Sequence, residues 1–432
     1  MMYNILDFGA VADGKTMNTK AINSAVEAAA KNGGGTVVIP AGGTFMSGTI
    51  WLKSHVELHL EHGAILKASG DFADYCANDA YPQNGHSDNE EWTGGHLIVA
   101  VEQEDVAITG TGMIDGNVWA FVSEKDQLHD GWVNENHLYC WFEGFLRAIR
   151  PGQTIAIVEC KDVKVEDITL RELPSWCLFL HGCDRVQVKG IKVYNRPDMA
   201  NTDGIDIDSC RYVTVSDCII DTGDDAIAIR NSKRRLKNQE GRLCEYVSIS
   251  NCVLASCSSV FRIGVGLGTL KHMRISNLTV NRGSTLINFN TEYGTLNHTP
   301  ISDVNFSNIS ATNISHAFQA NTYSGIHVDH VTLENIRVEA RASSCIVNQT
   351  SDAAVFNDFT IRNFDIFLVD DQPTIDDNII RQRGEYVIDV QNASGVRFDN
   401  VRIFGTDECK AKWKGMLHAE NAPGLEIKEC NF

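Results

Sequence analysis

Three aspartates in two short motifs have the residue type and spacing for acid–base chemistry. Residues 201–208 read NTDGIDID and include Asp203, and residues 221–230 read DTGDDAIAIR and include Asp224 and Asp225. Asp203 precedes the other two by 21 and 22 residues. Carboxylates that lie close together raise one another's pKa, because each negative charge opposes the next ionisation. One carboxylic acid could then donate a proton while another carboxylate activates water, the two roles that hydrolysis of a glycosidic bond requires.

Each aspartate also has a purely structural interpretation. Asp side chains in turns often hydrogen-bond to their own backbone, and we interpret Asp206, Asp208, Asp217 and Asp221 in this way. Several carboxylates together could instead bind calcium. Two adjacent acids can both face one cleft only where the chain turns, and we expect Gly223 to supply that freedom.

A repeat of short alternating strands sets the positions of these motifs. Spacings between successive anchor residues are 23, 27, 34, 26, 31, 27, 28 and 37. Alternation with a period of two, inside a repeat of this length, is typical of a β-solenoid. Stacked coils would bury one continuous core and pair each backbone with its neighbours. The anchors, each the central residue of a phrase such as VKVEDITL or MRISNLTV, are Asp167, Gly190, Asp217, Asn251, Asn277, Asn308, Asn335, Asn363 and Asn400.

The repeat predicts an all-β fold, a single-stranded right-handed parallel β-helix that occupies residues 1–432 as one domain. No leucine-rich, WD or kelch signature recurs in the sequence. Residues 18–32 show apolar residues at helical spacing before a run of three glycines. We expect this short helix to cap the solenoid, with residues 1–50 forming the N-terminal cap and first coils. Residues one coil apart would be about 4.7–4.9 Å apart in space, which brings the three aspartates together.

Composition narrows the classes of partner. The chain of 432 residues has a formal charge of −19, which argues against binding nucleic acid or an anionic membrane. No signal-peptide pattern and no apolar run of about 18 residues occurs in the sequence. We therefore expect a cytoplasmic location, or a secreted one if a signal peptide has been removed. The 13 cysteines lie mostly within apolar alternation and lack CxxC pairs, which favours buried free thiols.

The two acidic motifs resemble the NTD and DD motifs of glycoside hydrolase family 28, the polygalacturonase-like enzymes. The opening YNILDFGAVADGKTMNTKAI, the segment GTGMIDGNVW and the segment RPGQTIAIVECKDVKVEDITL are also similar to pectinase-type β-helix chains, so the likeness spans roughly residues 3–290. The resemblance implies inverting hydrolysis, with Asp224 as the general acid. It implies that Asp203 and Asp225 activate water.

The sequence departs from the family where a galacturonate carboxylate would be bound. Family members that cleave polygalacturonate carry a GHG motif about one coil after the DD pair, but here the matching stretch, residues 257–264, has no histidine. They also carry an RIK motif one coil later, where this chain has Asn288 and Asn290. Arg230 and Arg262 could replace the missing cations or could balance the carboxylates.

Further substrate-binding candidates follow from position. His181 precedes Asp203 by 22 residues, which predicts a place one coil earlier in roughly the same column, where it could bind sugar hydroxyls or tune the acid. Trp119, Trp176 and Tyr293 could stack on sugar rings, although Trp176 fits the core better. The substrate-binding residues predicted in full are Asn201, His181, Arg230, Arg262, Asn290 and Glu292.

The sequence therefore predicts a glycoside hydrolase that acts on a pectic or other plant or microbial oligosaccharide or polysaccharide. We expect exo action and inversion, with no cofactor and no metal. Two alternatives remain open, a calcium-dependent polysaccharide lyase and a non-catalytic carbohydrate-binding β-helix. The sequence gives no basis for predicting the oligomeric state.

Overall fold

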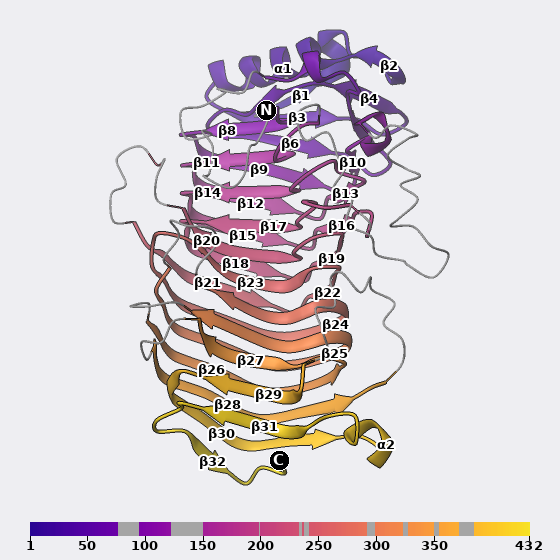
Figure 1. Ribbon diagram of the computed structural model, residues 1–432. Helices are drawn as coiled ribbons and strands as arrows, with labels where there is room; N and C mark the ends of the chain where they lie inside the picture. The colour runs from indigo at the N-terminus through magenta and orange to yellow at the C-terminus, as the bar shows by residue number, and fades with distance from the viewer. Residues whose placement is uncertain are drawn as a thin grey trace.

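A computed structural model of the chain shows an elongated stack of coils, with the N-terminus near one end and the C-terminus at the other (Figure 1). The structure describes residues 1–76, 95–121, 150–197, 199–232, 236, 242–291, 299–322, 327–349, 354–370 and 384–432. Its strands are joined in one 32-stranded sheet, and neighbouring coils pair in parallel, as β17 (Ile205–Asp208) and β20 (Ile227–Asn231) do. This confirms the predicted parallel β-helix.

Three parallel ladders of strands form the walls of the solenoid. Some later strands are long enough to pass from one wall into the next, and β24 (Leu270–Asn290) pairs with β21 (Cys244–Ser250), β22 (Val253–Ser256) and β23 (Ser259–Gly266). The first ladder contains β1 (Met2–Asn4), β3 (Gly35–Ile39), β6 (Val56–Leu60), β9 (Glu104–Gly110), β12 (Lys161–Glu166), β15 (Asp184–Lys189), β18 (Arg211–Ser216) and β21 (Cys244–Ser250). The second contains β2 (Asp13–Met17), β4 (Thr44–Ser47), β7 (Ile65–Ala68), β10 (Met113–Asp115), β13 (Thr169–Arg171), β16 (Lys192–Tyr194), β19 (Ile219–Thr222) and β22 (Val253–Ser256).

The third ladder carries the residues of greatest chemical interest. It contains β5 (Ile50–Trp51), β8 (Ile98–Val101), β11 (Ile155–Val158), β14 (Leu178–His181), β17, β20 and β23 (Ser259–Gly266), followed by the end of β24. The later strands are β24 (Leu270–Asn290), β25 (Ile301–Thr322), β26 (Val328–Ala340), β27 (Ser344–Asn348), β28 (Ala354–Leu368), β29 (Tyr386–Gln391), β30 (Ala393–Phe404), β31 (Gly415–Glu420) and β32 (Glu426–Lys428).

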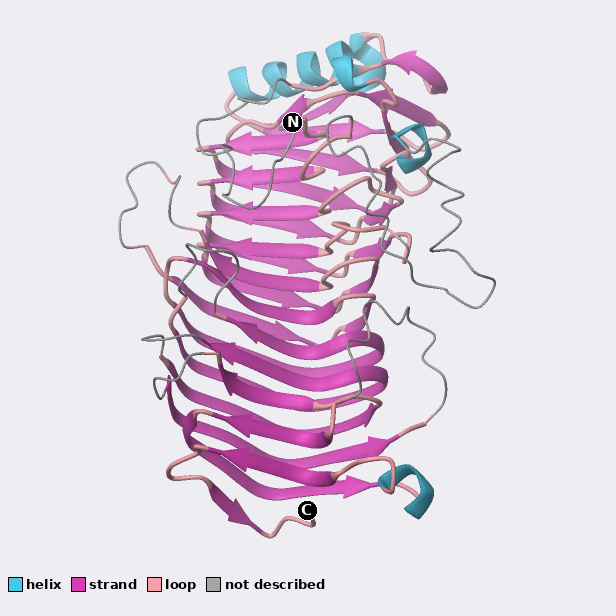
Figure 2. Cartoon of the chain, viewed as in Figure 1, coloured by secondary structure: helices cyan, strands magenta, loops and turns pink. Residues whose placement is uncertain are grey.

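Helices lie at the two ends of this strand-dominated chain (Figure 2). The helix predicted over residues 18–32 is α1 (Thr19–Lys31), which buries Ile22 and Val26 against the first coils. Gly33 and Gly34 follow it with φ of 86° and 119°, a left-handed backbone that favours glycine and ends the helix. The other described helices are α2 (Asp407–Lys410) and three 3-10 turns, at Ile5–Phe8, Phe72–Asp74 and Val118–Phe121.

The predicted anchors form the turn between the first two ladders. All nine have a left-handed backbone, with φ between 48° and 65°. Asn tolerates this conformation better than most residues because its side chain can hydrogen-bond locally. In the later coils the Asn amides also bond to one another, each Nδ2 donating to the Oδ1 of the preceding anchor at 2.8–3.5 Å, in the order Asn251, Asn277, Asn308, Asn335, Asn363 and Asn400.

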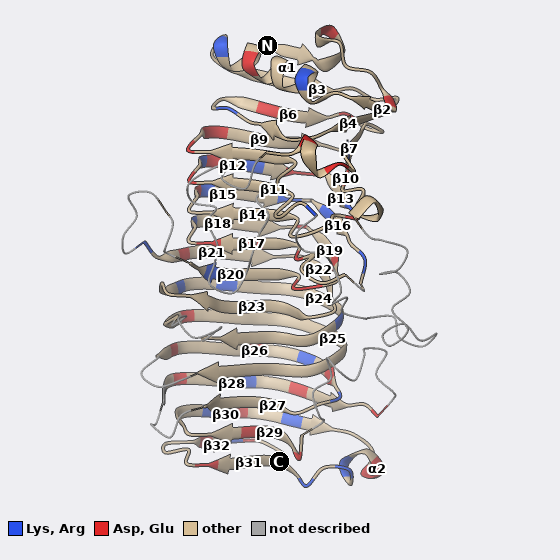
Figure 3. Cartoon of the chain, turned by 45° about the horizontal axis from the view of Figure 1, so that its top comes forward, with Lys and Arg blue, Asp and Glu red and all other residues tan. Residues whose placement is uncertain are grey.

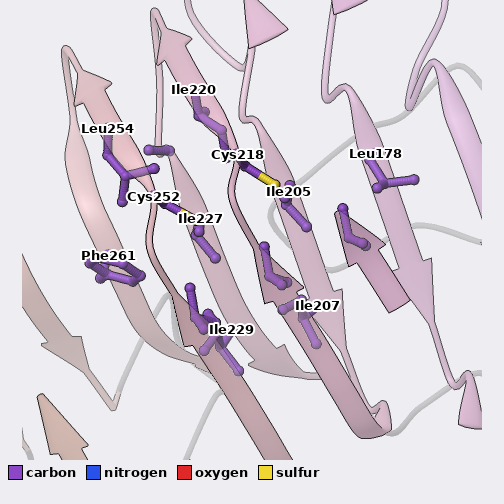
Figure 4. Packing of buried hydrophobic residues seen from close by; sticks show 14 of the residues in the cluster. Leu178, Ile205, Ile207, Cys218, Ile220, Ile227, Ile229, Cys252, Leu254 and Phe261 are labelled. Atoms are coloured by element: carbon purple, nitrogen blue, oxygen red, sulfur yellow. The ribbon is translucent and has the colours of Figure 1, made fainter. Parts of the chain in front are cut away.

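Inside the coils the core is continuous and apolar. Figure 4 shows the aliphatic side chains of successive coils in contact with Cys218 and Cys252. The cysteines of the described residues are free thiols, and most are buried. The prediction of buried free thiols is thus confirmed for these residues.

Charged residues of both signs are distributed along the length of the solenoid (Figure 3). Among the described residues, no helix combines the length and the apolar character that a membrane crossing needs.

Candidate active site

The three aspartates lie where the chain passes from the second ladder to the third. Asp203 comes just before β17, and Asp224 and Asp225 come just before β20. Ile205 pairs with Ile227, two positions after Asp203 and Asp225, so this register places Asp203 beside Asp225. One carboxylate oxygen from each of the three lies within 4.8 Å of the other two. All three side chains are buried, and the predicted cluster is therefore present.

The turn before β20 needs glycine at position 223 for a steric reason. Gly223 does not have a left-handed φ, so the predicted role of glycine as a source of unusual backbone freedom is wrong. A Cβ atom there would lie 2.3 Å from the carbonyl oxygen of Met199 and 2.4 Å from that of Arg196. Both contacts are too short for any real side chain. Glycine thus allows the loop before Asp203 to pack directly on the turn that carries Asp224.

Burial and repulsion between carboxylates shift Asp203 and Asp224 toward their protonated forms. Burial, and after it the charge of Asp225, raises the pKa of Asp224 from 3.8 to about 7. Burial, followed by the charge of Asp224, raises the pKa of Asp203 well above its ordinary value. Strongly interacting acids titrate as a group. At neutral pH the cluster therefore retains a proton that it could donate.

Asp225 is held by a set of donors that suits a carboxylate. Arg262 donates from Nε to Asp225 Oδ2 and from Nη2 to Asp225 Oδ1, the second at 3.1 Å. The backbone N–H of Ser259 also donates to Oδ1, at 2.9 Å. Arg262 comes from β23 and lies in register with Ala228 of β20. Of the two roles predicted for this arginine, the balancing of the carboxylates matches its contacts.

Asn201 contributes to the site through its backbone. Its N–H donates to Asp224 Oδ2 at 2.8 Å, and its φ is 59°. Its side-chain Oδ1 accepts from Nη2 of Arg150 at 3.0 Å. Arg150 is almost fully buried and also donates to the carbonyl oxygens of Pro174 and Ala200. The side chain of Asn201, which the sequence predicts to bind substrate, therefore holds the loop before β17 in place through its contact with Arg150. Arg150 lies outside the sequence repeat, so the repeat does not identify it.

Arg230 lies beside the acids on the outer side of β20. Its Nη1 is 3.8 Å from Oδ1 of Asp206, and its guanidinium lies over the ring of Trp176, 4.7 Å from the centroid. Trp176 is buried, as expected, although it is not part of the apolar cluster inside the coils. It packs outside the third ladder, where its indole ring offers the guanidinium a cation–π contact.

The predicted position of His181 is wrong by several residues. His181 pairs with Asp208, because the coil between β14 and β17 is longer than the coil between β17 and β20. The neighbour of Asp203 in the preceding coil is Trp176, as the hydrogen bond from Cys177 N to Asp203 O shows. His181 is buried, and burial lowers its pKa. Its Nε2 lies 3.4 Å from Oγ of Ser232, which donates to Asp208.

The two remaining candidates lie farther along the chain. Asn290 is the last residue of β24, half-buried, and pairs with Gly264 and Asn321. Glu292 and Tyr293 lie outside the described residues. Asn288, two positions before Asn290, pairs directly with Arg262. The comparison with the RIK motif identifies Asn288 only as a position where a cation is missing. Its apolar neighbours Ile287 and Phe289 are the sequence signal that its side chain faces outward, on the same side as Arg262.

A cation fits this cluster poorly. Three carboxylate oxygens at this spacing could contact one ion, but calcium takes six to eight oxygen ligands. The other groups that contact Asp224 and Asp225 include the N–H groups of Asn201, Ser259 and Arg262. Donors of this kind present positive charge where a cation would have to bind. The geometry suits carboxylates that exchange protons better than carboxylates that bind a metal.

Residues 34–379 match the model of the family described as glycosyl hydrolases family 28. A probable polygalacturonase of Vitis vinifera is 32% identical over 233 residues, which cover 53% of this chain and 44% of the relative. An exo-poly-alpha-D-galacturonosidase of Dickeya chrysanthemi is 28% identical over 254 residues, which cover 52% of this chain and 41% of the relative. The match to each of these two relatives thus spans less than half of the relative's length.

Two solved structures share the fold over nearly the whole chain. The exopolygalacturonase of Thermotoga maritima has a TM-score of 0.63 at 20% identity and covers 100% of this chain and 92% of its own. The endo-xylogalacturonan hydrolase of Aspergillus tubingensis has a TM-score of 0.61 at 15% identity, with 99% and 98% covered. At these identities the likeness shows the fold alone.

Proposed function

Since the chain belongs to glycosyl hydrolases family 28 and is a glycosidase, we propose that it removes sugar units from the end of a pectic oligosaccharide with inversion of configuration. In this proposal Asp224 protonates the leaving oxygen, and Asp203 and Asp225 activate the attacking water. Family membership favours this hydrolase over the lyase and the non-catalytic β-helix. Exo action is supported by the Dickeya relative, an exo-poly-alpha-D-galacturonosidase.

The observation that carries the proposal is the buried cluster of three carboxylates, in which the pKa of Asp224 is raised. A general acid works best when its pKa lies near the pH at which the enzyme operates, and Asp224 reaches about 7. The two N–H groups that donate to it, from Asn201 and Asp225, come from backbone and fix its orientation. Asp225 is fixed in place by Arg262 and by the N–H of Ser259, and in this proposal it activates water together with Asp203.

The stereochemical outcome rests on the resemblance rather than on the separation of the acids. Opposed carboxylates in inverting enzymes are about 6.5–9.5 Å apart, and those in retaining enzymes about 5–5.5 Å. Oxygens within 4.8 Å are closer to the second range. A direct measurement of the product anomer therefore tests the proposal severely.

The experiment is a screen of pectic, neutral and other plant-derived oligosaccharides, with the anomer of the first product followed by NMR. We expect release of single sugar units whose anomeric configuration is opposite to that of the cleaved bond. Asp224→Asn is expected to reduce turnover by about 10²–10⁴. Asp217→Asn is the matched control, because it makes the same chemical change at a turn anchor where the later coils already have Asn.

Retention of configuration would overturn the inverting part of the proposal, and release of internal fragments would overturn exo action. Unchanged sugar release by Asp224→Asn would remove the assignment of the acid.

A further inference from the structure

Asn288 lies one coil beyond Arg262 in a column of outward-facing residues on the third ladder. The column contains one residue from each coil, in register, in the order Phe179, Asp206, Ala228, Arg262, Asn288 and Gln319. The neighbours of Asn288 in sequence, Ile287 and Phe289, belong to the core. Its side chain therefore points out of the solenoid, on the side where Arg262 contacts Asp225.

The amide of Asn288 is only half satisfied. Its Nδ2 donates to Oγ of Ser259 at 3.1 Å, and the N–H of Ser259 donates to Asp225. The residue is 9% exposed, and its Oδ1 has no hydrogen-bond partner within the part of the chain that the structure describes. A buried acceptor without a donor is costly. This oxygen is thus placed to accept a hydrogen bond from a bound molecule.

The surroundings decide which kind of group can donate that bond. Arg262 is engaged with Asp225, and the next residue of the column beyond Asn288 is the neutral Gln319, whose Oε1 accepts from Thr285. A sugar carboxylate that faced Asn288 Oδ1 would set an acceptor against an acceptor, close to three buried aspartates. A sugar hydroxyl would supply the missing donor without adding charge.

We propose that Asn288 Oδ1 accepts a hydrogen bond from a hydroxyl of the substrate and so selects an uncharged sugar unit over a uronic acid at this position. The inference rests on the proposed function, because it assumes that the sugar lies beside the three aspartates. The inference adds to the proposed function the class of sugar, uncharged rather than acidic, that lies next to the three aspartates.

The test uses two disaccharides that differ only at C6, α-1,4-galactobiose with hydroxymethyl groups and α-1,4-digalacturonate with carboxylates. Their binding is measured by calorimetry on Asp224→Asn, which is not expected to turn them over. We expect galactobiose to bind at least about tenfold more tightly than digalacturonate, since a site that leaves a buried polar group unpaired rejects the wrong partner.

Three substitutions, each made in the Asp224→Asn chain, then examine position 288. Asn288→Ala should weaken galactobiose about fivefold or more and leave digalacturonate unchanged. Asn288→Asp retains an acceptor and should keep the preference for galactobiose, and it serves as the nearly isosteric variant if alanine disturbs folding. Asn288→Lys should reverse the preference toward digalacturonate. Asn305→Lys, at an outward Asn that bonds to Glu334 on another wall, is the matched control and should change neither affinity.

Equal or tighter binding of digalacturonate, no measurable binding of galactobiose, or equal effects of Asn288→Ala on both sugars would overturn the inference. The proposed function is judged separately, on sugar release by the unmodified chain. A chain that hydrolyses oligosaccharides but prefers digalacturonate overturns only the role of Asn288. A chain that binds galactobiose as expected but releases no sugar overturns only the proposed function.

Discussion

Strands β17 and β23 hold ionisable side chains in the outward column of the third ladder, whereas β24 and β25 hold neutral amides at the same register position. Asp206 and Arg262 occupy this column in the earlier coils, and Asn288 and Gln319 occupy it in the later coils. The backbone pairing is the same in both regions. The solenoid therefore keeps the same strand pairing along its length. The chemistry of each region depends on which residues occupy the outward positions of a few coils.

The cores of the two regions differ as well. Around the acids the interior consists mainly of Ile, Leu and Cys, and Phe261 of β23 lies among them (Figure 4). In the later coils phenylalanines pack edge to face, and Phe306 contacts Phe261 and Phe289 with ring centroids 5.2 and 6.1 Å apart. Such pairs add to the stabilisation from buried area. We therefore expect the later coils to act as a scaffold, and the coils with the acids to carry the unfavourable electrostatics.

The largest effect is expected from Arg262→Met. The change leaves Asp225 buried beside two other carboxylates, which should lower the free energy of unfolding by about 3–5 kcal/mol and reduce kcat/KM by about 10²–10³. The charge of Arg262 also lowers the pKa of Asp224, so its loss should move the alkaline limb of the pH–rate profile to higher pH. Urea denaturation and pH–rate profiles measure both effects.

Arg274→Met is the control for this change, because Arg274 is exposed and pairs with Asp303 on the first wall. It should alter stability by less than about 1 kcal/mol. An alkaline limb that stays in place or moves to lower pH in Arg262→Met would contradict the electrostatic account.

Phe306→Ala tests the scaffold region, where we expect a large loss of stability with little loss of activity. Phe306 is fully buried, and its truncation should lower the free energy of unfolding by about 3–5 kcal/mol. At temperatures where the variant stays folded, kcat/KM should remain within about twofold of the unmodified chain. A loss of activity larger than the loss of folded protein would show that the two regions are coupled.

The pH dependence of stability should separate the two regions further. The pKa values of Asp203 and Asp224 are raised in the folded chain, so the folded state binds protons more tightly than the unfolded state. The stability that this gives is fully present below the ordinary pKa of 3.8 and is lost as the pH rises through about 7. We expect the free energy of unfolding to fall between pH 4 and pH 8 by an amount on the order of 2–4 kcal/mol.

Denaturation of the unmodified chain and of Asp224→Asn at both pH values measures this loss. The variant, which has no carboxylate at position 224, should show a clearly smaller fall. An equal fall in the two chains would assign the pH dependence to groups outside the site.

The smallest effect is expected at the Asn ladder. Asn308 has a φ of 57° and bonds to both Asn277 and Asn335. Asn308→Ala loses two exposed hydrogen bonds and places a less tolerant residue in a left-handed backbone, which should cost about 1–2 kcal/mol. Asn308→Gly removes the same bonds without the backbone strain and should cost less. A larger loss of stability in Asn308→Gly than in Asn308→Ala would show that backbone strain is not the main cost of replacing Asn308.

The sequence could predict the coils because one physical constraint recurs in each of them. Asn277 and Asn363 both have a left-handed backbone next to an alternating strand, and the same sequence pattern accompanies both turns. The fold and the anchor positions can therefore be predicted from that pattern. The clustering of Asp203 with Asp225 also follows, because the coil between them is short and no inserted loop shifts its register.

Positions that depend on loop length could not be predicted in the same way. The sequence spacing places His181 beside Asp203, but the coil that joins β14 to β17 is longer, and its extra residues shift the partner of His181 to Asp208. The contact between Arg150 and Asn201 joins residues 51 apart in sequence that follow no repeat. The half-satisfied amide of Asn288 is a fact of three-dimensional packing, which alternation alone does not contain.

The central claim is that Asp224 gives the proton while Asp203 and Asp225 activate water, and leaving-group dependence tests it most directly. The measurement compares Asp224→Asn and Asp203→Asn on the oligosaccharide found by the screen and on the dinitrophenyl glycoside of the same sugar, whose leaving group needs no proton. Asp224→Asn should lose about 10²–10⁴ on the oligosaccharide and retain most activity on the dinitrophenyl glycoside. Asp203→Asn should lose activity on both. The reverse pattern, with Asp203→Asn spared on the activated substrate, would contradict the account and make Asp203 the acid.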